Sequence, residues 1–526
     1  MASKPLQWLQ QLQDSFVDST PRPGLHPIPN STPLTFTAAL LPPLTYYLAL
    51  LLLAPPPPLV IDTPPVKVLR NLLAVIAGIL FFRLPLVYHV PQSIGLTYQL
   101  GLIGLYGGCR VLDAFFISPY LFRHVPRRVT YHHTLRTESP EPVARAKAKE
   151  WTNGGVPDPF HHAGNRQEGN KRMDTGDGGR FRGRAASVSS SYGTAMSALR
   201  KSISGPDPVP VLETAVTESG WPMTLLDRAA WALELELSMR GVGFTWTTAD
   251  VRHTRKTWLP TVQNRIHSIL VHALPVLLVS WAIIRFIYAC YILPVQDSSW
   301  EAYSAYDLFD RRLPLDLQLL LTAALGAFLM AAFSFGHSLF AIMLSPLAPS
   351  PLAFFPPLYT TRPWEITTVR KFWSFGWHRL FARLFLVYGI WPGEWVERKL
   401  LGKRPEQPAD VGKVIGAFLS SAFVHSFAVR GVLAGNWRMA TGEAKFFALN
   451  GLAVVLEGAI IRAVKKSRAR RGHPIHMWYD TVVGRTWWVT VLLWTGRNFA
   501  RGWIKSGLCL EVRLRYAFRD QILQFL

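Results

Sequence analysis

Eight apolar segments, each about as long as a membrane-spanning helix, constrain this chain more than any other feature of its sequence. A helix needs about 20 mostly apolar residues to cross the hydrocarbon core of a bilayer. The segments are Thr35–Leu53, Leu69–Tyr88, Ile94–Ile117, Ile266–Leu293, Leu317–Leu344, Val414–Leu433, Phe446–Val464 and Trp487–Ile504. We therefore expect an all-α fold, a polytopic membrane helical bundle of about eight spans, in which Pro42 and Pro43 kink the first helix.

The charge of the chain excludes several other classes of protein. The 526 residues carry a net charge of +23, yet only 17% of them are charged, against about 25% in soluble domains. A soluble protein this basic would suggest nucleic-acid binding. Here the basic residues are spread between long apolar runs, which argues against a nucleic-acid partner and against a soluble enzyme. The three cysteines include no CxxC pair, so neither a disulfide framework nor a zinc ribbon is expected.

The distribution of Lys and Arg predicts how the chain is oriented, because cytoplasmic loops carry the excess of these residues. We expect an integral, multi-pass protein of the endoplasmic reticulum. The expected regions are a lumenal segment 1–34, three transmembrane helices in 35–120, a basic cytosolic loop 121–260, a second transmembrane region 261–510 and an amphipathic tail 511–526. Eight crossings would leave the basic residues from Lys505 onward in the lumen. Either the last segment does not cross, or an earlier one is re-entrant.

Residues 137–210 differ in composition from the rest of the cytosolic loop. They are rich in Gly, Ser, Pro and Arg and poor in apolar residues. Such a segment cannot bury enough surface to order itself, so we expect a disordered insert. Its Arg-Gly patch at 178–184 is interpreted as a solvated linker rather than an RNA-binding platform.

Ionisable residues inside the apolar segments are the first candidates for function, because they are costly to place in a membrane. His425 lies within the sixth segment, with Ser421 one helical turn earlier on the same face. A structural histidine bonded across helices is an equally good interpretation of its position. His337 has similar surroundings in the fifth segment, so position alone does not choose between the two histidines.

A cluster of aromatic and basic residues precedes the sixth segment. Residues 361–378 read TRPWEITTVRKFWSFGWH. One interpretation is an interfacial amphipathic helix with an aromatic belt. The other is a cytosolic mouth for an anionic, nucleotide-bearing substrate, in which Arg and Lys bind phosphates and aromatic rings stack on a base.

Three motifs in the second half of the chain resemble one enzyme family. Residues 361–378 resemble the RPWE … SLRDFWGRRWHQ signature of the wax synthase-like branch of the membrane-bound O-acyltransferases. Residues 418–425, FLSSAFVH, resemble its FLVSGLLHE helix, and 231–244, WALELELSMRGVGF, resemble the WALDLL … RGIGW element of fungal members. The chain departs from this pattern at Lys371, where Asp is usual, at Ser374-Phe375, where Gly-Arg is usual, and at Ser426, which replaces Glu.

The resemblance implies a membrane-bound O-acyltransferase fold and a set of roles for the residues of region 261–510. His425 would be the catalytic general base, and His378 its polar partner. The implied contacts with the acyl-CoA co-substrate are Arg370, Lys371, Trp373 and Trp377, and those with the substrate tunnel are Trp364, Glu365, Ser421 and His337. No bound cofactor and no metal are implied. The expected partners are acetyl-CoA, a lipophilic alcohol and the lipid bilayer, together with upstream biosynthetic enzymes.

Three functions remain open at this point. The first is an acetyltransferase that acts on a hydroxyl of a terpenoid or meroterpenoid secondary metabolite. The second is a wax ester synthase that joins long acyl chains to fatty alcohols, and the third is a non-enzymatic transporter. His476 and Asp480 form the H-x-x-x-D pattern of soluble acyltransferases, which we interpret as a chance match because the fold that uses it is not expected here.

Overall fold

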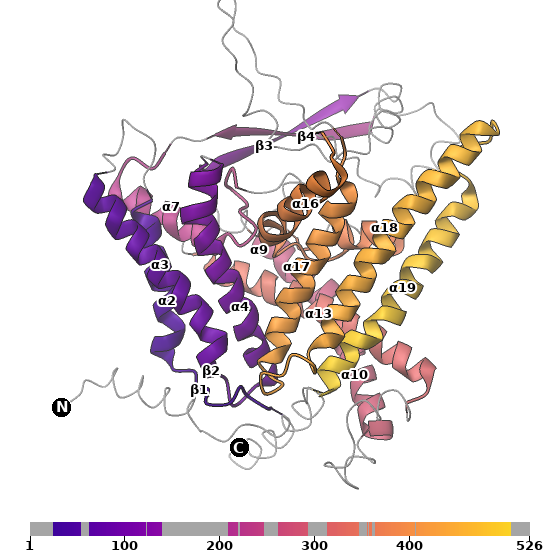
Figure 1. The fold of residues 1–526 in the computed structure, drawn as a ribbon, viewed down its shortest axis with the longest axis horizontal. Helices are drawn as coiled ribbons and strands as arrows, with labels where there is room; N and C mark the ends of the chain where they lie inside the picture. Colours follow the sequence, from indigo (N-terminus) through magenta and orange to yellow (C-terminus); the bar gives the residue numbers. More distant parts are fainter. Residues whose placement is uncertain are drawn as a thin grey trace, which may run out of the picture.

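The fold is a bundle of long helices, most of them side by side (Figure 1). The computed structural model describes residues 25–53, 63–122, 124–138, 209–218, 221–246, 261–292, 313–346, 355, 357–359, 363–404 and 407–505. The predicted all-α membrane bundle is confirmed. The predicted C-terminal tail, 511–526, lies outside the described residues.

The long helices make up most of the described chain. They are α2 (Phe36–Leu51), α3 (Pro64–Val87), α4 (Ile94–Leu112), α10 (Leu274–Ile287), α13 (Leu315–Leu344), α17 (Asp410–Arg430), α18 (Thr441–Arg470) and α19 (Trp478–Lys505). Shorter elements are α7 (Leu225–Leu237), α9 (Val262–His267), α14 (Val369–Lys371), α15 (Ala382–Phe385) and α16 (Trp391–Leu401). Wider π-helical turns extend α4 to Leu121 and join α9 and α10 into one continuous helical run.

Of the helices that the structure describes, six are long and apolar enough to cross a membrane. They are α3, α4 with its extension, the run Val262–Tyr291, α13, α17 and α18. The first and last of the eight predicted spans are helices but do not meet this standard. The 16 residues of α2 extend only about 24 Å, less than the hydrocarbon core of about 30 Å. In α19, Arg497 and Arg501 interrupt the apolar run.

Two clusters of buried apolar side chains hold the bundle together, and α4 contributes to both. One lies between α4, α10, α13, α17 and α19 and includes Tyr98 and Val424. The other lies between α2, α3, α4 and α7 and includes Trp231 and Phe244, from the third family-like motif. That motif therefore packs against the first helices of the chain.

Small residues bring α17 close to two neighbouring segments. Gly389 and Gly393 lie directly against Gly416 and Gly412 of α17, where an added Cβ would overlap the facing backbone. Gly101 of α4 lies against Ala428 of α17, where an added Cβ would be 2.6 Å from the Ala428 Cα. Small residues at such crossings are typical of membrane helices whose backbones approach closely.

Two pairs of strands accompany the helices. β1 (Thr32–Pro33) pairs in parallel with β2 (Tyr88–His89), and β3 (Val129–Glu138) pairs antiparallel with β4 (Val209–Glu218) at one end of the bundle (Figure 1). The predicted insert 137–210 therefore begins and ends in strand, at residues 137–138 and 209–210. The residues between β3 and β4 lie outside the described part of the chain.

Candidate active site

His425 lies on α17, five residues before the helix ends, and faces α4 and α18. Its Nδ1 atom is 2.7 Å from the hydroxyl oxygen of Tyr98 on α4 and 3.4 Å from Oε2 of Glu443 on α18. The Tyr98 hydroxyl also lies 3.4 Å from that same Oε2 atom and donates to it. Phe447, one turn after Glu443, stacks on the imidazole with ring centroids 4.5 Å apart. The ring is thus held at one edge and on one face.

The backbone explains why these three polar groups meet. Ser93 caps α4 by accepting a hydrogen bond from the Leu96 amide at 3.1 Å, so Tyr98 lies in the first turns of the helix. Gly101 lies about one turn after Tyr98 on α4. Its contact with Ala428 brings α4 against the end of α17 that carries His425. Glu443 is the third residue of α18 and is fully buried.

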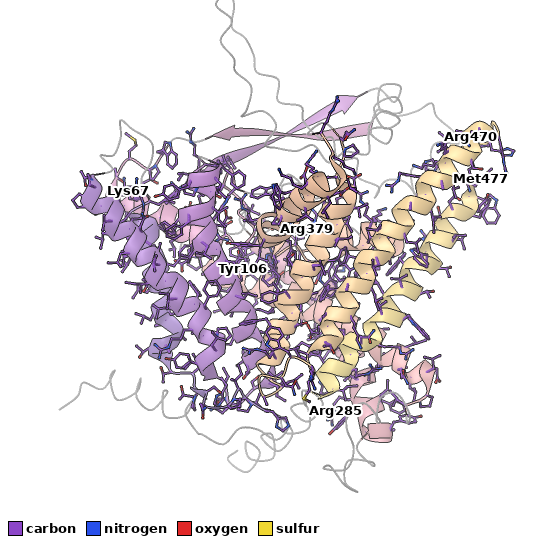
Figure 2. All side chains as sticks on the ribbon, viewed as in Figure 1. Lys67, Tyr106, Arg285, Arg379, Arg470 and Met477 are labelled. Atoms are coloured by element: carbon purple, nitrogen blue, oxygen red, sulfur yellow. The ribbon has the colours of Figure 1, made fainter. Side chains whose placement is uncertain are left out.

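The segment that carries His378 packs into the bundle instead of lying on its surface. Phe381, Leu384 and Val387, which follow His378, are buried, and the first two belong to the same apolar cluster as Val424 of α17. Figure 2 shows Arg379 in the middle of the bundle, whereas Arg470 lies at the outer end of the α18–α19 hairpin. The sequence places this segment in a loop before the sixth span, and that interpretation underestimates how much of the segment is enclosed by the bundle.

His378 is surrounded by aromatic rings. Its ring centroid is 4.9 Å from that of Phe333 on α13, 5.2 Å from that of Trp377 and 5.9 Å from that of Phe381. Its Nδ1 atom is buried and has no hydrogen-bond partner among the described residues. Burial lowers the pKa of His378 to about 3, with smaller contributions from His425 and Arg240. The ring is therefore uncharged at neutral pH.

Trp373 connects the two histidine segments. Its indole N–H donates to Oδ1 of Asn450 on α18 at 3.1 Å. Its ring contacts Phe447, which stacks on His425, and Trp377, which contacts His378. The structure therefore brings Trp373 and Trp377 into one aromatic layer with both histidines.

The two basic residues of the same motif lie at a distance from His425. Val369 and Arg370 donate their amide hydrogens to the Glu457 carboxylate of α18, at 2.7 and 3.2 Å. Because Glu457 follows Glu443 by 14 residues, these amides lie about 21 Å further along α18. The Lys371 ammonium donates to the Glu365 carbonyl oxygen at 2.6 Å. Glu457 therefore caps α14.

The remaining predicted tunnel residues do not converge on His425. Trp364 is 61% exposed, and the adjacent Glu365 is half-buried. Ser421 is buried on α17, one turn before His425. His337 lies on α13, and its Nε2 atom is 3.5 Å from Nη2 of the buried Arg240.

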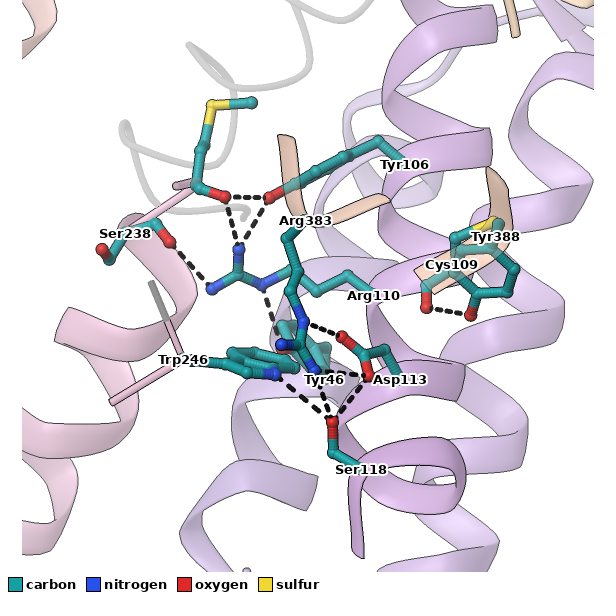
Figure 3. Close-up of polar contacts among 11 residues, drawn as sticks. Tyr46, Tyr106, Cys109, Arg110, Asp113, Ser118, Ser238, Trp246, Arg383 and Tyr388 are labelled. Carbon is teal, nitrogen blue, oxygen red and sulfur yellow. Dashed lines mark hydrogen bonds and ion pairs between the residues drawn. The ribbon is translucent and has the colours of Figure 1, made fainter. Parts of the chain in front are cut away.

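A second polar network, shown in Figure 3, lies further along α4 and has a structural role. Arg383 donates to the two Asp113 oxygens at 2.7 and 3.1 Å and to the Ser118 hydroxyl at 2.7 Å. Arg110 donates to the carbonyls of Leu235, Ser238 and Met239. These bonds hold the segments around α7 and α15 against α4.

Asp480 of the H-x-x-x-D pattern belongs to the α18–α19 turn. It accepts two hydrogen bonds from Arg468, at 2.6 and 2.8 Å, and one from the Met477 amide at 2.9 Å. The Arg468 hydrogen bond lowers the pKa of Asp480 to about 2. In the described part of the chain, no group of three or more His, Cys, Asp or Glu residues could hold a metal ion.

Sequence reasoning missed the two groups that contact His425 most directly. Glu443 precedes the predicted span Phe446–Val464, in what the apolar pattern indicates is a loop, and Tyr98 is one aromatic residue among many in an apolar segment. The signal that pointed toward Glu443 was indirect: Ser426 stands where the family pattern has Glu, which leaves a carboxylate to be supplied from elsewhere.

Comparison with known proteins agrees with the motifs. Residues 355–449, which include His378, His425 and Glu443, match the profile of the Membrane bound O-acyl transferase family. This match confirms the resemblance to the membrane-bound O-acyltransferases. The chain is also 25% identical over 246 residues to the acetyltransferase eriL of Hericium erinaceus, which is 46% of this chain and 60% of eriL.

The match to a second relative covers a larger share of that relative's length. The chain is 24% identical over 300 residues to the acetyltransferase ple2 of Rhodocybe pseudopiperita, which is 55% of this chain and 72% of ple2. No solved structure matches the chain. The family match concerns membrane-bound O-acyltransferases, and both relatives are named acetyltransferases of fungi.

Proposed function

We propose that this protein is an acyl-CoA-dependent O-acyltransferase that transfers an acetyl group from acetyl-CoA to a hydroxyl of a lipophilic terpenoid or meroterpenoid. The observation that carries the proposal is His425 within the family-matched segment, with Nδ1 hydrogen-bonded to Tyr98 and only 12% of the side chain exposed. A neutral imidazole held in this way has one ring nitrogen left to accept a proton. The choice of acetyl follows the two relatives, which are named acetyltransferases.

The chemistry requires one base and a dry site. As the acceptor oxygen attacks the thioester carbon, its proton moves to Nε2 of His425. When the carbon–sulfur bond breaks, that proton moves to the departing CoA sulfur. The aromatic layer of Trp373, Trp377 and Phe447 would exclude water that otherwise hydrolyses the thioester. The uncharged His378 would orient the acyl group or donate to the oxyanion.

The positions of the basic residues fit a long, bipartite donor. Arg370 and Lys371 lie about 21 Å from Glu443 along α18, and CoA carries its phosphates and its sulfur at opposite ends of an extended arm. We therefore retain both residues as proposed phosphate contacts. We propose that the end of the bundle that carries Arg370 and Lys371 faces the cytosol, where acyl-CoA is made. The protein is proposed to lie in the endoplasmic reticulum and to receive its acceptor from upstream enzymes.

Transfer assays in microsomes test this proposal. The full-length protein is incubated with acetyl-CoA or palmitoyl-CoA as donor and with farnesol or hexadecanol as acceptor. We expect farnesyl acetate as the main ester, and a loss of about 100-fold or more in rate for His425→Ala. His476→Ala, at an exposed histidine, is the matched control and should retain the wild-type rate.

Two outcomes would contradict the proposal in different ways. If hexadecyl palmitate is the main product, the wax ester synthase suggested by the wax synthase-like motif is the correct function. If well-folded His425→Ala transfers acetyl at the wild-type rate, His425 is not the base.

A further inference from the structure

Glu443 is the most deeply buried ionisable group next to His425. Its side chain is fully buried near the start of α18, one of the helices long and apolar enough to cross a membrane. Burying a carboxylate is unfavourable unless hydrogen bonds and a nearby cation compensate for the lost water. An ionisable residue at such a position is therefore expected to serve the function of the protein.

The hydrogen bonds around Glu443 have a defined direction. The Tyr98 hydroxyl has a single hydrogen, which it donates to Oε2 of Glu443. Its oxygen lies 2.7 Å from Nδ1 of His425 and has only lone pairs left for that contact. With Nδ1 carrying the ring hydrogen, His425 can donate to Tyr98 while Tyr98 donates to Glu443. This arrangement leaves Nε2 of His425 without a hydrogen.

The surroundings make this edge of the imidazole a closed compartment. The titratable groups that face His425 are Tyr98 from α4, Glu443 from α18 and His378 from the segment before α15. Phe447 covers one face of the imidazole, and Trp503 of α19 lies against Tyr98 with ring centroids 4.6 Å apart. Glu443 is the one carboxylate among these groups.

We propose that Glu443 is a positioning residue that, directly and through Tyr98, fixes the Nδ1–H tautomer of His425 and stabilises the imidazolium formed during transfer. This inference rests on the proposed role of His425 as base. When the acceptor hydroxyl gives its proton to Nε2, the ring gains a positive charge, and the Glu443 carboxylate 3.4 Å from Nδ1 offsets it. The proton then leaves from Nε2 to the CoA sulfur, and Glu443 and Tyr98 return unchanged.

Modification of His425 by diethyl pyrocarbonate tests the inference without a substrate. The reagent acylates unprotonated imidazole, so the labelling rate of His425, followed by peptide mass spectrometry, rises with pH. The experiment uses the full-length protein in lipid nanodiscs. In Glu443→Gln, the pH of half-maximal labelling should fall by about one unit, because the variant lacks the charge that favours the imidazolium. Tyr98→Phe should give a smaller fall.

Glu457→Gln is the matched control. Glu457 is also a buried glutamate on α18, but it caps α14 instead of contacting His425. Its substitution should leave the pH of half-maximal labelling of His425 unchanged. Labelling of the exposed His476 should be the same in every variant. Glu443→Asp, which keeps the charge, should restore at least half of the shift. An unchanged midpoint in Glu443→Gln, or an equal shift in Glu457→Gln, would overturn the inference.

Transfer assays separate this inference from the proposed function. Glu443→Gln should lower kcat by about tenfold or more with little change in the KM for acetyl-CoA, and should move the acidic limb of the pH–rate profile to lower pH. If His425→Ala keeps full activity, the proposed function fails whatever the labelling shows. If His425→Ala is inactive and Glu443→Gln has the wild-type rate and pH profile, only the role of Glu443 fails.

Discussion

The Asp113–Arg383 pair allows a quantitative test of how the segment around His378 is held in place. Both side chains are buried, with 2% of Asp113 and 9% of Arg383 exposed. Two hydrogen bonds join them, and the Ser118 hydroxyl is a third partner in the network. Asp113→Asn keeps the size and shape of the side chain but removes the charge, so Arg383 stays buried without its counterion.

The expected loss follows from the cost of an uncompensated buried charge. Hydrogen bonds to charged groups contribute about 1.5–3 kcal/mol each, and an asparagine oxygen can replace only one of the two. Removing one partner of a buried pair typically costs about 3–5 kcal/mol. We therefore expect the free energy of unfolding of Asp113→Asn to fall by about 3 kcal/mol or more.

Titration with sodium dodecyl sulfate in mixed micelles, followed by tryptophan fluorescence, measures this loss. The control is Glu394→Gln on α16, which breaks the partly exposed ion pairs with Arg398 and with Lys413 of α17 and should cost about 1 kcal/mol. If Asp113→Asn costs no more than Glu394→Gln, the buried pair does not hold this segment and our reasoning is wrong.

Two further predictions concern a helix crossing and a turn. Gly101→Leu should push α4 away from Ala428, and therefore move Tyr98 away from His425. We expect at least a tenfold loss of transfer activity and a lower melting temperature. Unchanged activity and melting temperature would contradict the close approach of α4 and α17. The Arg468 hydrogen bond holds the pKa of Asp480 at about 2, below the ordinary 3.8, so its contribution to stability is complete above pH 4 and disappears as the pH falls toward 2. Melting temperatures of wild type and Asp480→Asn should therefore differ at pH 6 and converge near pH 2; a difference that persists at low pH would refute this assignment.

Helices and the two histidine motifs were accessible from sequence because both are local patterns. A run of apolar residues predicts a helix, and the motif spacing singled out His378 and His425 without reference to distant parts of the chain. The count of spans was less accurate, since α2 is one turn too short and α19 carries arginines. The first detail depends on helix length, and the second on polar residues, Arg497 and Arg501 among them, that lower the mean hydropathy of α19.

The contacts of the site could not be predicted in the same way. Tyr98 and Glu443 are 345 positions apart, and only the packing of α4 and α18 against α17 brings them together. The enclosure of the segment around His378 depends on how it packs between α13 and α17, and no local sequence pattern predicts that packing. β3 and β4 did leave a local signal, because both are rich in Val and Thr, but the composition of the residues between them obscured it.

The glycine contacts between Gly389–Gly393 and Gly412–Gly416 have a consequence for how the protein can move. Backbone lies directly on backbone there, and the side-chain atoms among the nearest neighbours, Ser420 Oγ and Glu397 Cβ, leave little room for a displacement. The segment bearing His378 and the helix bearing His425 must therefore shift as one rigid piece. Admission of the alcohol acceptor that we propose would then require α4, α18 or α13 to yield. Differences in acceptor preference among related chains should arise on those helices, while the spacing of the two histidines stays constant.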